Sequence, residues 1–238
     1  MGDIKKNDLK PWQKHQWCLA QITGEFLARM EDLLDLYEQP YDANFPQVCF
    51  DERPCQLIGN QLVPLPMRPG SPRKEDYEYR RNGTCCVMLA VEPLRGRRMV
   101  RVFRHRTKKE YARFMKALAQ RYPHARRIRL VQDNLNTHIA GSFYEVFAPE
   151  EAHRLMDKFE FHYTPRKASW LNMAEIELAA LSKQCLDRRI GDQQILTREV
   201  RSWEQQRNRD RTTISWRFTT NSARTTMAQH YKNVKQSS

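Results

Sequence analysis

The sequence predicts an α/β fold in which helices cover both faces of a mixed β-sheet of about five strands. The first observation is a pair of apolar runs, Cys85–Val91 and Met99–Phe103, on either side of a turn at Gly96, which is typical of an antiparallel pair. The second is the order of the remaining segments, in which predicted strands alternate with predicted helices. A sheet that combines a hairpin with strand–helix units contains both antiparallel and parallel strands.

The elements are predicted from the spacing of apolar residues and from the residues that start and stop them. Apolar side chains three and four positions apart indicate helices, and strict alternation indicates strands. Thr107 and Glu110 form a capping box that starts one helix, and Pro123 ends it. Asn82-Gly83 predicts a tight turn, and the proline-rich segment Pro64–Arg73 predicts a loop. The other expected elements are, in chain order, a helix over Glu25–Glu38, a strand over Gln47–Asp51, a strand over Arg127–Asp133, a short helix from Pro149, a strand over Phe159–Tyr163, a helix over Leu171–Leu186, an amphipathic helix after Gly191 and an alternating segment at Ile214, Trp216 and Phe218.

The charge of the chain points to a polyanionic partner. Its 238 residues carry a formal net charge of +13, and the isoelectric point is near 9.7. The excess is concentrated in Arg95–Arg129, where 14 basic residues face a single acid, Glu110. Such clustering is typical of a nucleic-acid-binding surface. The basic residues expected to contact DNA are Arg95, Arg97, Arg98, Arg101, Arg104, Arg106, Lys108, Lys109, Arg113 and Lys116.

Secreted, membrane-spanning and zinc-finger classes do not fit the sequence. The longest uninterrupted apolar run is the seven-residue stretch Cys85–Val91, which is too short to span a bilayer. The first fourteen residues contain no apolar signal core, so we expect a cytosolic protein with reduced thiols. The six cysteines form no C-x-x-C pair and the seven histidines form no H-x₃₋₅-H motif, so no zinc site is predicted.

Acidic residues end two of the predicted strands. Asp51 and Asp133 would meet at one edge of the sheet, because the carboxyl ends of strands converge in open α/β sheets. Two carboxylates beside a basic surface favour a divalent metal bound next to phosphate. A pair of such ions needs a third carboxylate, and the following helix offers Glu175 and Glu177. The spacing does not choose between these two glutamates.

Four segments of the chain resemble bacterial insertion-sequence transposases related to mariner elements. These proteins belong to the DDE superfamily, whose catalytic core has a ribonuclease H-like fold. The resemblance spans about Lys10 to Arg189, and the segments follow the family's order. They are CFDERP (Cys49–Pro54), DYEYRRNGT (Asp76–Thr84), LVQDNLNTH (Leu130–His138) and HYTPRKASWLNMAEIE (His162–Glu177).

The resemblance implies catalytic and metal-binding roles for Asp51, Asp133 and Glu175, and it leaves Glu177 with a structural role. The 41 residues between Asp133 and Glu175 exceed the spacing of animal mariner members, which we interpret as a difference between branches. Asn134, Asn136, His138 and Asn172 are expected to support the site, although His138 could equally cap the segment that follows it.

The implied activity is cleavage of DNA at transposon ends by a metal-activated water, followed by attack of the freed 3′-hydroxyl on target DNA. Two Mg²⁺ or Mn²⁺ ions are expected, with double-stranded DNA as partner and a homodimer in the synaptic complex. The implied location is the nucleoid of a bacterial cytosol. The alternatives are a catalytically silent, truncated transposase remnant that only binds DNA, and a host ribonuclease H-like nuclease.

The sequence divides into three expected parts. Residues 1–45 form an N-terminal linker with one amphipathic helix, 46–190 form the catalytic core and 191–238 form a basic C-terminal extension. No helix-turn-helix DNA reader is evident before Gln47, so we expect this chain to be the catalytic portion alone. The extension is either a packed helix and strand that close the domain, or an arm that grips DNA or a second subunit; we favour the arm.

Overall fold

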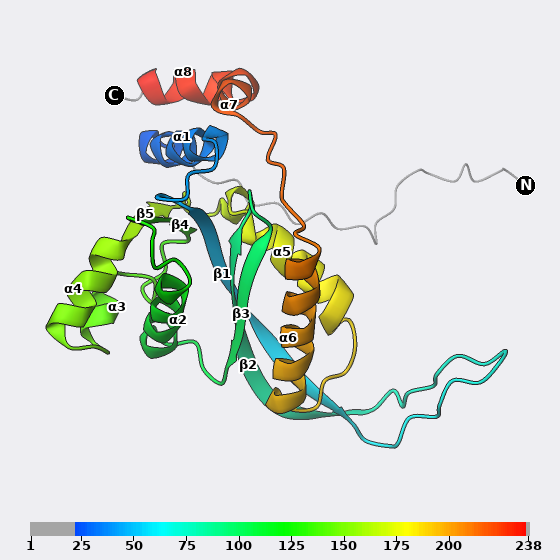
Figure 1. Ribbon diagram of the computed structural model, residues 1–238. Coiled ribbons are helices and arrows are strands. Elements are labelled where there is room, and N and C mark those ends of the chain that lie inside the picture. The colour runs from blue at the N-terminus through cyan, green and yellow to red at the C-terminus, as the bar shows by residue number, and fades with distance from the viewer. Residues whose placement is uncertain (1–21, 237–238) are drawn as a thin grey trace, which may run out of the picture.

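A five-stranded mixed sheet forms the centre of the molecule (Figure 1). The computed structural model describes residues 22–236. The strand order is β3-β2-β1-β4-β5, in which β1, β2 and β3 are antiparallel and β4 and β5 run parallel to β1. This confirms the predicted mixed sheet. The bounds are β1 Gln47–Asn60, β2 Tyr79–Glu92, β3 Arg97–Phe103, β4 Ile128–Gln132 and β5 Phe159–Tyr163.

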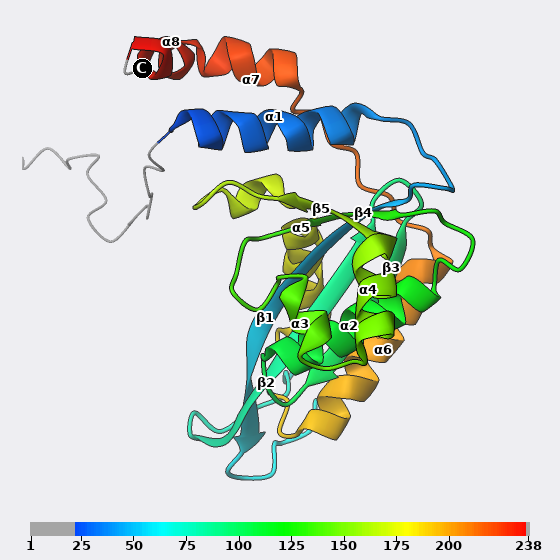
Figure 2. The same cartoon turned by 90° about the vertical axis from the view of Figure 1, so that its left-hand side faces the viewer.

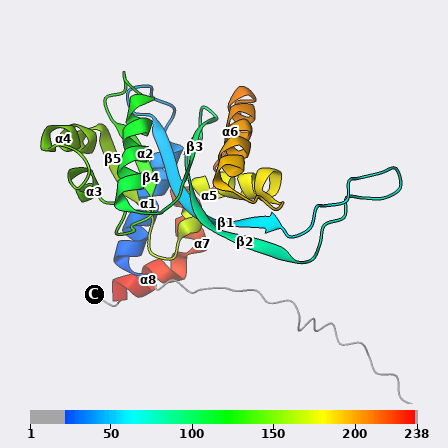
Figure 3. The same cartoon turned by 90° about the horizontal axis from the view of Figure 1, so that it is seen from below.

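Helices cover both faces of the sheet because its central strands are apolar on both sides (Figure 3). Along β2, Val87 and Leu89 belong to one hydrophobic cluster, whereas Cys86 and Met88 belong to the other, as the alternation of side chains requires. The first cluster contains α1 (Gly24–Glu38), α5 (Ala174–Leu181) and α6 (Gln193–Arg209), and the second contains α2 (Lys108–Gln120), α3 (Gly141–Tyr144) and α4 (Pro149–Lys158).

Threonine caps start α1 and α2, of which the sequence predicted the one at Thr107. The Thr107 hydroxyl accepts a hydrogen bond from the backbone N–H of Lys109 at 3.2 Å and begins α2. The Thr23 hydroxyl plays the same part for α1, where it accepts from the N–H of Phe26 at 3.2 Å. Both helices then bury the apolar stripe that the sequence predicts, including Met30 in α1 and Tyr111 in α2.

Strand β1 is much longer than predicted. It continues past Asp51 to Asn60, because β2 remains hydrogen-bonded to it over nearly this whole length. The Asn82-Gly83 pair is therefore not a hairpin turn but lies inside β2, near an irregularity between Gln56 and Ile58, with Gly83 at φ +96°. The two strands and the loop over residues 61–78 project from the body of the protein as an arm (Figures 1 and 3).

The described part of the C-terminal extension packs on the core. Helix α6 lies against β3 and buries Leu196, Val200 and Trp203. The following segment, with Ile214 and Trp216, also packs on this cluster, but it is extended chain rather than the expected strand.

The last two helices, α7 (Thr220–Thr226) and α8 (Ala228–Gln236), lie beside α1 (Figure 2). The Arg224 guanidinium pairs with Glu31 at 2.8 Å, and the Thr220 hydroxyl donates to Asp35 at 2.6 Å. These contacts join the two ends of the described chain, as the domain-closing alternative requires. None of the helices within residues 22–236 is long and apolar enough to cross a bilayer.

A buried ion-pair network fastens α5 and α6 to β3. Arg98, 1% exposed, donates two hydrogen bonds to the Glu177 carboxylate at 2.7 and 2.8 Å, and Arg207 of α6 donates to the same carboxylate at 2.6 Å. Burial raises the pKa of Glu177, but the two guanidiniums outweigh this effect and hold the pKa below its ordinary value. The prediction that Arg98 contacts DNA is wrong, because its charge is used inside the fold. The structural role expected for Glu177 agrees with this network.

We expect Glu177→Gln to lower the free energy of unfolding by about 3–5 kcal/mol, because it leaves the buried Arg98 without a countercharge. Urea unfolding would measure the change. The matched control is Glu175→Gln, two residues earlier on the same helix, whose exposed side chain predicts a change within about 0.5 kcal/mol. Equal stability of the two variants would contradict the role assigned to the network.

Candidate active site

Strand register brings Asp51 and Asp133 together. The parallel pairing of β1 with β4 aligns Gln47 with Arg129 and Cys49 with Val131. Continued by two residues, this register places Asp51 opposite Asp133, which follows directly after β4 ends. Neighbouring strands lie about 4.8 Å apart, so two residues more than eighty positions apart in the chain become neighbours. The sequence predicts that the strand ends at Asp51. In the structure only the pairing with β4 ends near Asp51, and β1 continues to Asn60.

Asn172 positions the start of α5 against β1. Its side-chain amide donates to the backbone carbonyl of Phe50 at 2.8 Å, and its side-chain oxygen accepts from the N–H of Ala174 at 3.1 Å. The Tyr37 hydroxyl donates to the carbonyl of Leu171 at 2.7 Å and holds the preceding residue. These bonds fix the start of α5, whose second residue is Glu175, against the residue that precedes Asp51. The helix predicted over Leu171–Leu186 is divided into a 3₁₀ turn (Ser169–Leu171), α5 and a π-helical turn (Ser182–Leu186).

The helical period separates the two glutamates that spacing alone could not distinguish. Residues two positions apart on a helix point about 200° apart. Glu177 is buried against Arg98, and Glu175 is exposed on the side that adjoins Asp51.

Asp133 and Glu175 are close enough to Asp51 for their charges to repel its carboxylate. Burial raises the pKa of Asp51 to about 7, although a hydrogen bond from the N–H of Glu52 at 2.8 Å opposes the rise. The negative charges of Glu175, Glu52 and Asp133 raise it further. Both other members of the predicted triad thus raise the pKa of Asp51. Within residues 22–236, no group of three His, Cys, Asp or Glu side chains is arranged so that it could hold a metal ion.

Beneath this site, a buried histidine holds the second aspartate. His138, 1% exposed, hydrogen-bonds through Nδ1 to the carboxylate of Asp133, and its Nε2 lies 2.8 Å from Oε2 of Glu52. Tyr111 stacks on the imidazole ring at 4.9 Å between centroids. Burial lowers the pKa of His138, but the contacts with Asp133 and Glu52 outweigh it and raise the pKa to about 9. The histidine is therefore a cation held between two carboxylates.

Glu52 was not among the site residues predicted from the sequence. It follows Asp51 directly, so its side chain lies on the opposite face of β1, among the aromatic residues that surround His138. Arg106 approaches it at 3.3 Å from the loop before α2. Two adjacent acids directly after the buried run Gln47–Phe50 are the signal that indicates such a two-sided site.

The other predicted supporting residues lie in different surroundings. Asn172 is buried and acts through the backbone contacts described above. Asn134 and Asn136 are exposed on the loop after β4, and Asn134 lines a cavity beside α1. The structure does not show a capping role for His138, whose ring is occupied by Asp133 and Glu52.

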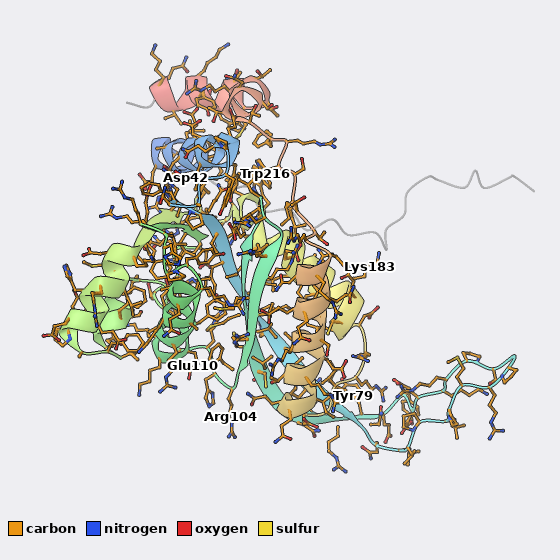
Figure 4. The ribbon with its side chains drawn as sticks, viewed as in Figure 1. Asp42, Tyr79, Arg104, Glu110, Lys183 and Trp216 are labelled. Carbon is orange, nitrogen blue, oxygen red and sulfur yellow. The ribbon has the colours of Figure 1, made fainter. Side chains whose placement is uncertain are left out.

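The basic segment is less free than its composition predicts. Lys108 and Lys116 lack acids at i+4, yet they pair at 2.5 Å with Glu145 and Glu151 near α3 and α4. Three arginines contact other parts of the fold: Arg95 donates to Tyr41, Arg101 pairs with Glu204 and Arg106 pairs with Glu52. The exposed basic residues of the set that form neither an ion pair nor a side-chain hydrogen bond within the described chain are Arg97, Arg104, Lys109 and Arg113. Figure 4 shows Arg104 projecting outward from the loop between β3 and α2.

The family of the chain follows from its sequence. Residues 46–197, from the start of β1 into α6, match the family described as DDE superfamily endonuclease. The chain belongs to this family. The match covers Asp51, Asp133 and Glu175, and it spans well over half of the 238 residues of this DDE superfamily endonuclease. No curated protein matches the sequence.

Solved structures of the Mos1 mariner transposase are similar in fold to this DDE superfamily endonuclease. The paired-end complex with Mn superposes with a TM-score of 0.56 at 13% identity, covering 99% of this chain and 67% of that one. The strand transfer complex gives 0.53 at 15% identity, with 99% and 66% covered. The paired-end complex with Mg gives 0.51 at 15% identity, with 99% and 67% covered. The similarity confirms the predicted ribonuclease H-like fold.

Neutralising Asp51 should stabilise the metal-free protein, with an effect that grows with pH. The pKa of Asp51 is about 7 in the folded state against an ordinary value of 3.8, so the folded state binds the proton more tightly. Stability therefore falls as the pH rises from about 4 to 7, and the whole penalty is present above 7. We expect Asp51→Asn to raise Tm at pH 8 by about 2–4 °C for each kcal/mol relieved.

Thermal melts in chelator at pH 5 and pH 8 measure this effect. The gain should be clearly smaller at pH 5, where Asp51 of the unmodified protein is already protonated when folded. A variant that melts lower than the parent at pH 8 would contradict the repulsion inferred among the acids.

Proposed function

We propose that this endonuclease is the catalytic core of a transposase that cleaves DNA strands at transposon ends and joins them to target DNA. The observation that supports the proposal is the strand register that sets Asp51 opposite Asp133, with Glu175 near enough to raise the pKa of Asp51. Asp51 lies in β1, Asp133 directly after β4 and Glu175 in α5, and a bound cation would relieve the repulsion at Asp51. Such a site suits phosphodiester chemistry, in which negative charge develops on oxygen.

The donor set fits hard divalent cations. Mg²⁺ prefers carboxylate oxygens and retains waters and substrate phosphate oxygens, so an open group of three carboxylates suits it. We propose that Asp51 and Asp133 share one Mg²⁺ or Mn²⁺ ion and that Glu175 completes the site of a second. When bound, two such ions activate the attacking oxygen and stabilise the leaving oxygen of an in-line displacement. The Mos1 structures with Mn and with Mg are consistent with this choice of ions.

The protein's own residues orient the acids. His138 holds the Asp133 carboxylate by a hydrogen bond, and Glu52 balances the charge of the imidazolium from the other side. Asn172 fixes the distance between α5 and β1 through the carbonyl of Phe50. These contacts hold the carboxylates in place before substrate binds, which reduces the reorganisation required during the reaction.

The substrate and partners are proposed from the similar solved structures. The matched Mos1 structures are paired-end and strand transfer complexes, which supports double-stranded DNA as substrate and a homodimer in the working complex. We assign catalysis to residues 46–190, with 1–45 and 191–238 as flanking parts; residues 1–21 lie outside the described chain. The proposed activity would take place at the nucleoid of a bacterial cytosol.

Removing one member of the triad should abolish cleavage without unfolding the protein. We expect Asp133→Asn and Glu175→Gln each to lower the rate of Mg²⁺-dependent nicking of transposon-end DNA by at least about 100-fold, because each loses several kcal/mol of charge stabilisation. The matched control is the exposed Asp187, whose change to Asn should leave the rate unaltered. Thermal melts would show that all three variants fold.

The same assay distinguishes the alternatives. Undiminished cleavage by Asp133→Asn would refute the triad. DNA binding by the parent protein with no cleavage in Mg²⁺ or Mn²⁺ would favour a silent remnant, and preferential cutting of RNA in hybrids would favour a host nuclease.

His138 is expected to act through Asp133 and not on the substrate. We predict that His138→Gln raises the Mg²⁺ concentration for half-maximal activity by about 10–100-fold, the usual cost of losing a residue that orients a metal ligand. The control is His124→Gln at an exposed position. An unchanged Mg²⁺ dependence in a folded His138→Gln protein would show that the histidine only fills space.

A further inference from the structure

A cavity of about 480 Å³ adjoins the loop that follows Asp133. One wall is formed by Asn134 and the turn after β5, and the other by the first turns of α1 with Phe26 and Arg29. The β4–β5 pairing aligns Gln132 with Tyr163, and the N–H of Thr164 donates to the carbonyl of Gln132 at 2.9 Å. The turn after β5 therefore begins beside Asp133, and the cavity opens next to the carboxylates.

The lining of this cavity carries more positive than negative charge. Arg29, Arg166 and Lys167 contribute three cations, and Glu25 contributes one carboxylate. Glu25 pairs with Arg29 at 2.5 Å, which neutralises that arginine locally. Arg166 and Lys167 are exposed and form no hydrogen bond or ion pair with the described residues. Two unpaired cations thus stand beside a group of acids that would otherwise repel DNA.

The backbone holds these two cations at the tip of a tight turn. The N–H of Ala168 donates to the carbonyl of Pro165 at 3.1 Å, which closes a four-residue turn with Arg166 and Lys167 at its centre. Pro165 and Ala168 are both buried and anchor the turn. Lys167 has φ +60°, a conformation that favours glycine or asparagine at the third position of a turn. The chain carries a lysine at this strained position with its charge unused by the fold.

We propose that Arg166 and Lys167 bind the phosphates of the DNA strand that runs into the carboxylate site, next to the bond that is cut. This assignment rests on the proposed function and adds to it a positioning role for the turn Pro165–Ala168. The cavity gives the strand space on the α1 side, and the two cations offset the negative charge of the acids. The predicted basic surface on α2 is less suited to this task, since Lys108 and Lys116 are already paired within the fold.

The test is the salt dependence of DNA binding by the double variant Arg166→Gln, Lys167→Asn. Asparagine removes the charge yet tolerates the left-handed backbone, so the turn is preserved. Binding of a fluorescent DNA duplex is measured by anisotropy in chelator, where no cleavage occurs, over a series of salt concentrations. Each phosphate contact contributes about 0.9 to the slope of log K against log salt, so the double variant should lose about 1.8.

A matched variant decides whether the effect is local. Lys232→Gln with Lys235→Gln removes two exposed lysines from α8 and should leave the slope unchanged. An unchanged slope for the Arg166, Lys167 variant, or an equal loss in the α8 variant, would overturn the proposal. Recovery of half of the lost slope when Lys167 is restored would support it.

The experiment distinguishes failure of this inference from failure of the proposed function. If the parent protein binds DNA but never cleaves it, the transposase proposal fails, and the slopes still decide the phosphate site. If the parent cleaves, the double variant should raise the KM for DNA and largely retain kcat, because the turn positions the strand and does not touch the reacting atoms. A fall in kcat with unchanged KM and slope would contradict the positioning role.

Discussion

The candidate site depends on one structural constraint, the register of the parallel pairing between β1 and β4. The hydrogen-bonded pairs end at Cys49 and Val131, and two residues further on each strand carries an aspartate. A shift of one residue would turn either carboxylate to the other face of the sheet, because side chains alternate along a strand. Buried apolar residues on both faces of β1 prevent such a shift, so the hydrophobic core determines the spacing of the polar site.

Because side chains alternate along β1, Asp51 and Glu52 lie on opposite faces of the sheet. Asp51 lies on the face that α5 covers, where it senses Glu175, and Glu52 lies among the aromatic residues beneath. His138 connects the two faces at the point where β4 ends, by contacting both Asp133 and Glu52. A cationic histidine between two carboxylates lowers the repulsion around the candidate site.

Helix α5 likewise carries two glutamates with different roles on different sides. Glu175 is exposed beside the site, and Glu177 is enclosed by Arg98 and Arg207 on the other side of the helix. The second interaction fixes α5 to β3 and α6, and Asn172 fixes its start to β1. The orientation of Glu175 therefore depends on a buried ion pair that takes no part in the chemistry. Arg98 and Arg207 are thus basic residues whose charge stabilises the fold.

The sequence by itself predicted the sheet type and most of the elements, and it proposed Asp51 and Asp133 with Glu175 or Glu177 as a third acid. Helices over Glu25–Glu38 and after Thr107 follow from local spacing and caps, which need no tertiary information. Tertiary structure decided the length of β1, the insertion of Asn82-Gly83 in β2 and the partners of Arg98, Lys108 and Lys116. These features depend on residues far away in the chain, so no local pattern contains them. Composition counts charges, but only the folded packing determines which charges meet inside the protein and which remain for a ligand.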